Sequence, residues 1–267
     1  MYAYVTLVTN DDYAMGALAL ARSLKTAGCS APLIVMATAG AGGLDALESF
    51  GANVIEVAQP PLSDAFRERH QRQALHSAAP FTKGEKPRFH DPLDNFCKLR
   101  LWELDGYRRL VFIDADAIVL QNIDRLLGYP QFCAAPNLYQ SLGDFGRLNS
   151  GVFVAEPDKA TFAAMVRELD LPDAFWPRAD QTFLQHRFPG WHGLPYLDNV
   201  LQYVFFNLPE LWLWPDIRIL HYQYEKPWQD DHPRRDQLQP LIDLWWRIYE
   251  GGRPPDELPT PFAGRER

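Results

Sequence analysis

Two aspartates separated by one residue, Asp114 and Asp116, follow a short apolar segment and could bind a divalent cation. Continuous apolar residues from Val111 to Ile113 predict a strand that is covered on both faces of a parallel sheet. The carboxyl end of such a strand opens into the crevice where α/β sheets bind ligands. A cation would satisfy both carboxylates and could also hold a diphosphate. Because the motif is short, a polar strand end with solvated or capped carboxylates is the structural alternative.

Two basic residues near the C-terminus could complete such a site. His221 follows another short apolar run, and a nitrogen donor beside two carboxylates suits Mn²⁺ better than the all-oxygen shell of Mg²⁺. Lys226 carries a compact charge that suits phosphate. Each residue also has a structural interpretation, since isolated histidines and loop lysines are usually core or solvated residues.

The elements that would position these residues alternate between strands and helices. This alternation predicts an α/β fold with a mostly parallel, doubly wound sheet. The expected order is a strand from Tyr2 to Thr9, a helix from Tyr13 to Thr26, a strand from Leu33 to Met36, a helix from Leu44 to Phe50, a strand from Val54 to Val57 and a helix from Asn95 to Leu104.

The remaining segments are less regular. Residues 59–92 carry several prolines and predict an irregular excursion, with a polar and partly helical piece from Ser63 to Ala78. Residues 233–250 show apolar residues at helical spacing and predict a C-terminal docking helix. We expect one domain over residues 1–250 and a loose tail over residues 251–267.

Composition narrows the function classes. A formal charge of -8 and a pI near 5.4 argue against nucleic acid or an anionic membrane as partner. The three cysteines lack paired spacing, so a disulfide framework is not expected and a cytoplasmic location fits best. The chain starts without a signal-peptide pattern and has no apolar run of the ~18 residues that a membrane span needs, which predicts a protein that is not integral to a membrane.

Several segments together resemble the family 8 glycosyltransferases, the family of glycogenin and galactinol synthase. The matching segments, in the order that the family shows, are Val5 to Ala17, Lys98 to Trp102, Val111 to Asp124, Leu148 to Phe153, Ala179 to Gln181 and His221 to Trp228. The resemblance implies a single-domain, Rossmann-like fold of the GT-A type. It also implies a hexosyltransferase that uses a UDP-sugar donor, with retention of the anomeric configuration.

The resemblance also assigns roles to individual residues. The nucleoside would lie against Leu7, Thr9, Asn10 and Tyr13. Mn²⁺ or Mg²⁺ would be bound by Asp114, Asp116 and His221, with Ala115 in the same turn. Lys98, Asn149, Ser150, Asp180 and Gln181 would surround the donor sugar, Asp180 and Gln181 as catalytic residues, and Lys226 would contact the β-phosphate. From the residues alone, Asn10 could instead be a helix N-cap, Asn149 a turn residue and Asp180 a first-turn carboxylate.

Two departures from the family pattern bear on function. Trp176-Pro177-Arg178-Ala179 precedes Asp180, where glycogenins have an acidic residue and glycines. Phe205 and Phe206 stand where glycogenins present the tyrosine that they glucosylate, although Tyr203 is nearby.

The leading function is therefore transfer of a hexose or related sugar to a glycan, a lipid-linked sugar or a small acceptor. A self-glycosylating initiator and a nucleotide-sugar-binding protein with reduced activity are the alternatives. Retention could proceed by double displacement, with Asp180 as nucleophile, or by front-side attack. We expect the 59–92 excursion and the loop from His221 to Trp228 to close over the donor.

A cluster of large aromatic residues follows Leu194. Sugar rings stack on aromatic side chains, so the cluster could line an acceptor groove. Core packing is the favoured interpretation, and a homodimer face is the other alternative. Its members are Tyr196, Tyr203, Phe205, Phe206, Trp212 and Trp214.

Overall fold

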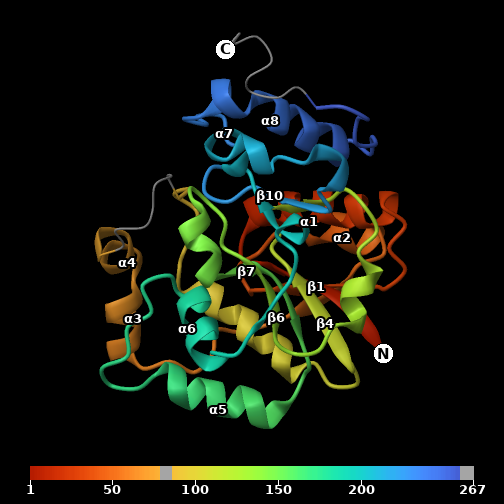
Figure 1. Cartoon of the computed structure of the whole chain (residues 1–267). Helices are drawn as coiled ribbons and strands as arrows, with labels where there is room; N and C mark the ends of the chain where they lie inside the picture. Colours follow the sequence, from red (N-terminus) through yellow and green to blue (C-terminus); the bar gives the residue numbers. More distant parts are fainter. Residues whose placement is uncertain (79–85, 259–267) are drawn as a thin grey trace.

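A seven-stranded sheet with the strand order β3-β2-β1-β4-β7-β6-β8 forms the centre of the molecule (Figure 1). The computed structural model describes residues 1–78 and 86–258. The strands of this sheet are β1 (Tyr2–Val8), β2 (Leu33–Ala37), β3 (Asn53–Glu56), β4 (Arg109–Ile113), β6 (Cys133–Pro136), β7 (Leu148–Ala155) and β8 (His192–Gly193).

The sheet is mostly parallel. β1 pairs in parallel with β2 and β4, and β2 pairs in parallel with β3. β7 runs antiparallel to β4 and to β6. The start of β7 therefore lies at the same edge of the sheet as the end of β4, which brings Asn149 and Ser150 close to Asp114. The predicted α/β fold with a mostly parallel sheet is confirmed.

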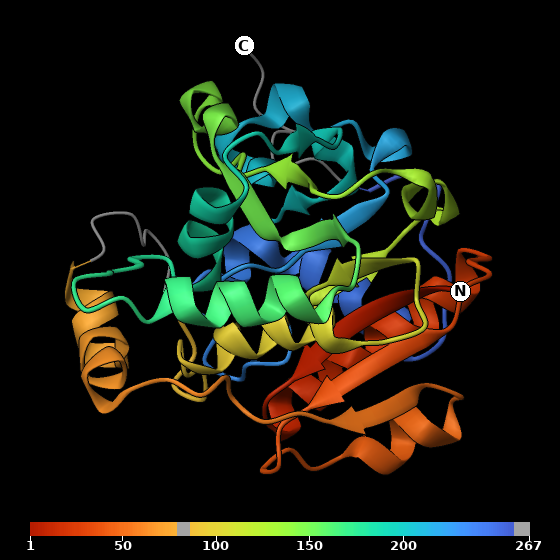
Figure 2. The same ribbon diagram turned by 90° about the horizontal axis from the view of Figure 1, so that it is seen from below.

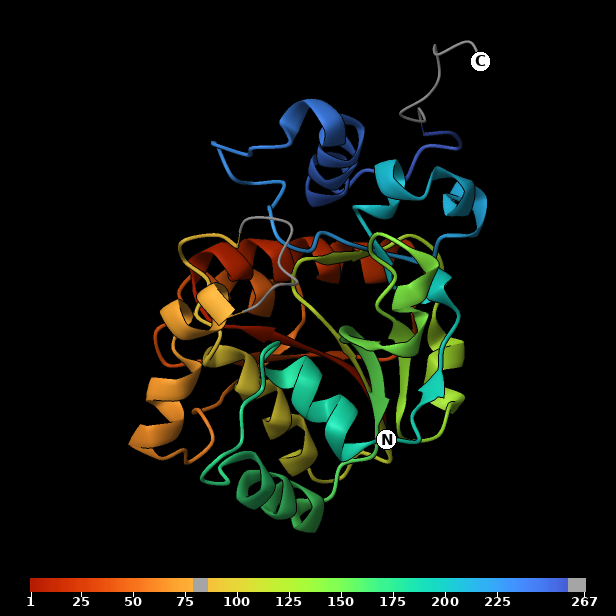
Figure 3. The same cartoon turned by 60° about the vertical axis from the view of Figure 1, so that its left-hand side comes forward.

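Both faces of the sheet are covered, as the apolar strands require. Along β1, Ala3, Val5 and Leu7 belong to one buried cluster and Tyr4 and Val8 to another, because successive side chains point to opposite faces. Figure 3 shows α1 and α2 on one side of the sheet, with α8 beyond them, and α5 and α6 on the other side. Seen from below, α5 runs across the sheet (Figure 2). The α-helices of more than one turn in the described part of the chain are α1 (Asp11–Thr26), α2 (Leu44–Ser49), α3 (Asp64–His70), α4 (Arg72–Ala78), α5 (Lys159–Leu169), α6 (Asp180–Arg187) and α8 (Arg235–Tyr249).

A smaller sheet with the order β5-β10-β9 carries the C-terminal part of the site. β10 (Ile219–His221) pairs antiparallel with β5 (Ala117–Val119) and parallel with β9 (Val200–Leu201). In this register His221 lies opposite Ala117, and the amide of Tyr222 donates to the carbonyl of Asp116 over 2.9 Å. The Asp114-Ala115-Asp116 turn thus joins the two sheets, and pairing with β5 places His221 beside it.

Short helices complete the chain. The single-turn α-helix is α7 (Val204–Asn207), and the 3-10 helices are η1 (Asp94–Glu103), η2 (Asp124–Gly128), η3 (Leu142–Gly146), η4 (Tyr196–Asp198), η5 (Pro209–Leu211) and η6 (Trp214–Asp216).

Some expectations about the elements need correction or lie outside the structure. The segment expected to be helical from Asn95 to Leu104 is the 3-10 helix η1, and its Phe96, Leu99 and Trp102 are fully buried against the sheet. Packing of these side chains outweighs the local preference for an α-helix. The excursion contains α3 and α4, and its residues 79–85 lie outside the described part of the chain, as do residues 259–267 of the predicted loose tail.

The C-terminal helix docks as its pattern predicts. α8 packs against α1, and its Leu238, Leu241 and Trp245 are buried. The domain boundary at residue 250 remains a prediction. Within residues 1–78 and 86–258, none of the helices has the length and apolar character that crossing a membrane requires.

Candidate active site

A cavity of about 300 Å³ opens where β1, β4 and the start of β7 meet. It lies at the carboxyl ends of the parallel strands, where α/β sheets bind ligands. Most of the predicted site residues line it, namely Leu7, Thr9, Tyr13, Lys98, Asp114, Ala115, Asp116, Asn149, Ser150, Asp180, Gln181 and His221. These residues come from six separate segments, so the fold brings together what the sequence keeps apart.

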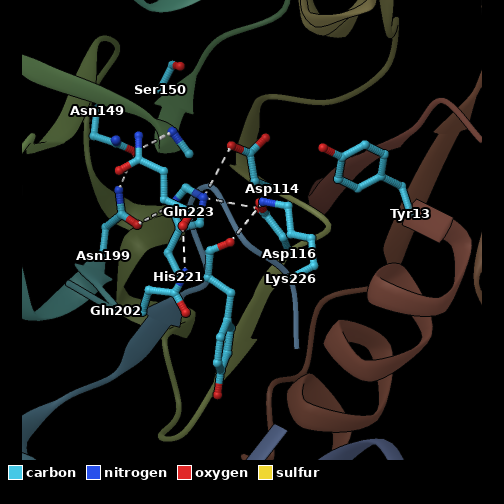
Figure 4. A network of polar contacts seen from close by, with 12 residues as sticks. Tyr13, Asp114, Asp116, Asn149, Ser150, Asn199, Gln202, His221, Gln223 and Lys226 are labelled. Carbon is cyan, nitrogen blue, oxygen red and sulfur yellow. Dashed lines mark hydrogen bonds and ion pairs between the residues drawn. The ribbon is translucent and has the colours of Figure 1, made fainter. Parts of the chain in front are cut away.

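Asp114, Asp116 and His221 form a cluster that could hold a metal ion (Figure 4). One ligand atom from each residue lies within 4.8 Å of the other two. His221 Nε2 is 3.1 Å from Asp116 Oδ1 and 3.7 Å from Asp114 Oδ2. Two carboxylates and one imidazole nitrogen suit Mn²⁺.

Buried amides determine which nitrogen of His221 faces the aspartates. The Gly151 amide donates to Asn149 Oδ1 over 2.8 Å, which identifies this atom as the amide oxygen. The same oxygen therefore accepts from Asn199 Nδ2, which lies 2.8 Å away. Asn199 Oδ1 must then be the atom that lies 3.0 Å from His221 Nδ1, and Nδ1 must donate to it. The lone pair of a neutral His221 therefore lies on Nε2, toward Asp114 and Asp116.

Gly151 is needed for this arrangement. A β-carbon at this position would lie 2.3 Å from His221 Cε1 and 2.5 Å from His221 Nδ1. Gly16 has a matching role on the other side of the turn, because its β-carbon would lie 2.4 Å from the carbonyl oxygen of Ala115. Both glycines permit close packing around the Asp114-Ala115-Asp116 turn.

Lys98 lies between two carboxylates. Its ammonium is 2.8 Å from Asp114 Oδ1 and 3.0 Å from Asp180 Oδ2. Burial would lower the pKa of Lys98, but Asp114 and Asp180 raise it above its ordinary value. Burial raises the pKa of Asp180, and Lys98 opposes that shift. Lys98 thus connects the metal cluster to the predicted catalytic carboxylate at the start of α6.

Lys226 lies on the other side of Asp116. Its ammonium forms an ion pair with Asp116 Oδ2 and donates to the Tyr222 carbonyl over 2.9 Å. Burial would raise the pKa of Asp116, but the charge of Lys226 holds it well below its ordinary value. Lys226 is itself buried and is not among the residues that line the cavity. In this structure it neutralises Asp116, and phosphate binding would require it to move or to share its charge.

The residues predicted to hold the nucleoside divide into two groups. Leu7, Thr9 and Tyr13 line the cavity, and burial followed by the charges of Asp116 and Asp114 raises the pKa of Tyr13. Asn10 does not line it. Its Oδ1 accepts from the Tyr13 amide as the N-cap of α1, and its Nδ2 donates to the Phe89 carbonyl over 3.1 Å. Asn10 is therefore a helix N-cap, the alternative to nucleoside binding, and it also contacts the 59–92 excursion.

Several residues of the site were not among the sequence predictions, and Asn199, which does not line the cavity, is one of them. Asn199 orients His221, but nothing in its sequence neighbourhood indicates that role. Arg178 was noticed only as a departure from the family pattern. The other additions to the cavity wall include Lys86, Asn137, Tyr139, Asp144, Arg147 and Tyr224.

The aromatic cluster after Leu194 is mostly core, as favoured. Tyr203, Phe205 and Trp212 are buried, and Tyr196, Phe206 and Trp214 pack against them partly buried. The hydroxyl of Tyr203 donates to Glu225, and the tyrosine does not line the cavity.

The chain is similar to known glycosyltransferases. Residues 4–131 match the family model described as Glycosyl transferase family 8. A putative UDP-glucuronate:xylan alpha-glucuronosyltransferase 5 of Arabidopsis thaliana is 30% identical over 98% of this chain and 43% of its own length. Glycogenin-1 of Homo sapiens is 29% identical over 92% of this chain and 71% of its own length. The chain spans less than half of the length of the plant relative.

Solved structures share the fold. The galactosyltransferase LgtC, in complex with donor and acceptor sugar analogs, superposes with a TM-score of 0.59 at 15% identity and covers 98% of this chain and 99% of its own. The glycosyltransferase GlyE of Streptococcus pneumoniae TIGR4 in its apo form gives a TM-score of 0.62 at 14% identity, over 93% of this chain and 60% of its own. These likenesses support the predicted GT-A type fold.

Proposed function

Because the chain belongs to glycosyltransferase family 8, we propose that it is a retaining, metal-dependent enzyme that transfers a sugar from a UDP-sugar to a carbohydrate acceptor. Membership of this family supports the transfer of a sugar, without naming the donor or the acceptor. The names of several relatives contain a UDP-linked donor and an alpha-linked product, which supports the nucleotide and the retention of configuration.

The hydrogen-bond chain from Gly151 to His221 is the observation that carries metal dependence. It directs the Nε2 lone pair of a neutral His221 at two carboxylates, 3.1 Å from the nearer one. A lone pair facing carboxylate oxygens is repulsive unless a cation or a proton lies between them. The donor set of Asp114, Asp116 and His221 fits Mn²⁺ well and Mg²⁺ less well.

A bound divalent cation would supply charge neutralisation for the leaving diphosphate. Asp114, Asp116 and His221 would hold it, and their geometry is already assembled. Lys226 would add a second positive charge for the diphosphate when it is released from Asp116. Tyr13, Leu7 and Thr9 would enclose the nucleoside.

Asp180 and Gln181 would act at the sugar. Lys98 holds the Asp180 carboxylate at 3.0 Å, which reduces its nucleophilicity. We therefore favour front-side attack, in which Asp180 stabilises positive charge on the sugar and the leaving phosphate accepts the proton of the acceptor. Asn149 and Ser150 would contact sugar hydroxyls from the start of β7.

Self-glycosylation at Tyr203 receives no support from this site. Tyr203 is 1% exposed and its hydroxyl is bound to Glu225. A binding protein without activity is disfavoured as well, because Asp180, Lys98 and Asp114 form a continuous ion-paired series.

The test is a panel of UDP-sugars and GDP-sugars incubated with Mn²⁺ and mixed carbohydrate acceptors. Turnover is scored by released nucleotide, and the anomeric configuration of the product is read by NMR. We expect turnover with a UDP-sugar and an α product, and loss of turnover in Asp116→Asn. The matched control is Asp243→Asn, which alters an exposed aspartate on α8. Absence of turnover and binding with every UDP-sugar would refute the proposal.

A further inference from the structure

One wall of the cavity comes from the excursion. Leu75 of α4, Lys86 and His90 line the cavity, and Leu75 and His90 are buried. Segments of this kind make few packing contacts, so their shape depends on the polar bonds that hold them. Arg72, the first residue of α4, supplies several of these bonds.

The guanidinium of Arg72 donates to the backbone of one short segment, residues 86–90. Its Nη2 donates to the Lys86 carbonyl over 3.0 Å, and its Nη1 donates to the Pro87 carbonyl over 2.8 Å and to the His90 carbonyl. The His90 amide donates to the Pro87 carbonyl over 3.1 Å, which closes a turn. Because a guanidinium presents its donors in a fixed plane, one side chain defines the path of this turn.

The turn that Arg72 organises contacts residues at the predicted nucleoside position. The Tyr13 hydroxyl and His90 Nδ1 share a hydrogen bond over 3.1 Å, and the Tyr13 and Phe89 rings lie edge to face with their centroids 5.5 Å apart. Asn10 Nδ2 donates to the Phe89 carbonyl over 3.1 Å. Burial and the nearby aspartates raise the pKa of Tyr13, and the charge of Arg72 opposes this rise. Arg72 is therefore coupled to Tyr13 through the turn and through its charge.

Tyr13 also contacts the loop that follows His221. The ammonium of Lys226 lies 5.9 Å from the centroid of the Tyr13 ring. The ring is thus held both by the excursion and by this loop. An aromatic face that is fixed before binding does not have to be ordered by the ligand, and this preorganisation preserves affinity.

Arg69 offers a contrast within the same excursion. Its Nε donates to the Ala174 carbonyl and its Nη2 to the Leu171 carbonyl, both over 3.2 Å. These bonds fasten α3 to the segment between α5 and α6. The two arginines therefore hold different segments, and Arg72 holds the one that reaches Tyr13.

We propose that Arg72 is a positioning residue for the nucleotide. Through the turn at residues 86–90, it holds Tyr13 in the orientation that receives the nucleoside of the donor. The inference rests on the proposed function and adds a residue to its nucleotide site. Arg72 itself does not line the cavity, so its effect on the ligand passes through His90 and Tyr13.

Calorimetric titration of UDP in the presence of Mn²⁺ measures this effect without sugar or turnover. Wild type is compared with Arg72→Gln, with Arg72→Lys and with the matched control Arg69→Gln. Tyr13→Phe removes the hydroxyl that bonds His90 and keeps the ring, so Tyr13→Phe and its combination with Arg72→Gln complete a double-mutant cycle. Urea unfolding of each variant reports stability separately.

We expect Arg72→Gln to weaken UDP binding about tenfold, because the ligand must then order the turn and the Tyr13 ring. Arg72→Lys should recover part of this affinity, since an ammonium is a compact charge without the planar donor array. Arg69→Gln should bind UDP as wild type does, even where it lowers the unfolding free energy. In the Tyr13→Phe background, Arg72→Gln should cost clearly less affinity than in wild type.

Equal UDP affinity of wild type and Arg72→Gln would overturn this inference and leave the proposed function standing. Equal losses of UDP affinity in Arg72→Gln and Arg69→Gln would overturn it as well, since they would show a general loosening of the excursion. Full additivity with Tyr13→Phe would have the same consequence. Should Arg72→Gln fail to fold, Arg72→Lys decides by the same outcomes. Failure of wild type to bind UDP with Mn²⁺ would overturn both the inference and the proposed function.

Discussion

Substitution of Gly151 by alanine should disable the metal site through His221. The added β-carbon would lie 2.3 Å from His221 Cε1, 2.5 Å from His221 Nδ1 and 2.8 Å from Asn149 Oδ1. Real β-carbons do not approach other atoms below 3.0 Å, so the ring must shift. Because Nδ1 is bound to Asn199, a shift of the ring breaks that hydrogen bond and turns Nε2 away from Asp116.

This clash should lower both the stability of the protein and its affinity for the metal. Overpacking a buried site costs about 1–3 kcal/mol of unfolding free energy. Loss of the orienting bond to a metal-binding histidine typically costs about 10–100-fold in metal affinity. The assays are urea unfolding, followed by circular dichroism, and Mn²⁺ binding, followed by the electron paramagnetic resonance signal of the free ion.

The matched control is Gly128→Ala, since a β-carbon there meets no atom within 4 Å. We expect this variant to keep the stability and the Mn²⁺ affinity of wild type. If Gly151→Ala folds with unchanged stability and binds Mn²⁺ as wild type does, the contact between Gly151 and His221 does not control the metal site.

Three further predictions concern neighbouring features. Asn199→Ala should weaken Mn²⁺ binding about 10–100-fold, measured by the same signal, because His221 loses its acceptor; unchanged affinity would contradict this role. His70 Nε2 accepts a hydrogen bond from the Trp176 amide over 2.9 Å, and burial lowers the pKa of His70 in the folded protein. The neutral histidine therefore stabilises the fold fully above the unfolded pKa of about 6.5, and this stabilisation is lost as pH falls through the lower folded pKa. Urea unfolding between pH 5 and 8 should show this loss in wild type and less of it in His70→Asn, and equal slopes would count against it. Ala179→Gly should raise the unfolding free energy by about 1 kcal/mol. Glycine removes the backbone strain at a φ of 48°, and this gain outweighs the added flexibility of the unfolded chain. A decrease in unfolding free energy would show that the position is unstrained.

Much of the fold could be predicted from local pattern. The apolar strands of the parallel sheet, and α8 with its buried Leu238 and Trp245, follow from periodicity alone. η1 did not, because the burial of Phe96 and Trp102 on the sheet determines its 3-10 geometry. Local sequence does not report which face of a segment will meet the core.

The site shows the same division. Asp114 and Asp116 were recognisable beside their strand, and His221 was recognisable after another apolar run. The pairing of β10 with β5 brings His221 to the two aspartates. Asn199 could not be found this way, because its role depends on a contact with a residue 22 positions away. Lys226 was predicted as a phosphate contact, but here its ammonium is paired with Asp116.

The structure adds contacts around the residues that are predicted to surround the donor sugar. Asp180 lies against Lys98 as part of an ion-paired series, which spacing alone does not reveal. Arg178 was visible in the sequence only as a departure from the family pattern. In the structure it lines the cavity together with Arg147 and Lys86.

We propose that Asp114, Asp116 and His221 hold the metal that binds the donor diphosphate. Titration calorimetry of UDP into wild type, with Mn²⁺ and after chelation with EDTA, tests it most directly. We predict UDP binding that requires Mn²⁺ and that falls at least about tenfold in Asp116→Asn and in His221→Ala. UDP binding that is equally tight with and without Mn²⁺, or unchanged in both variants, would contradict it.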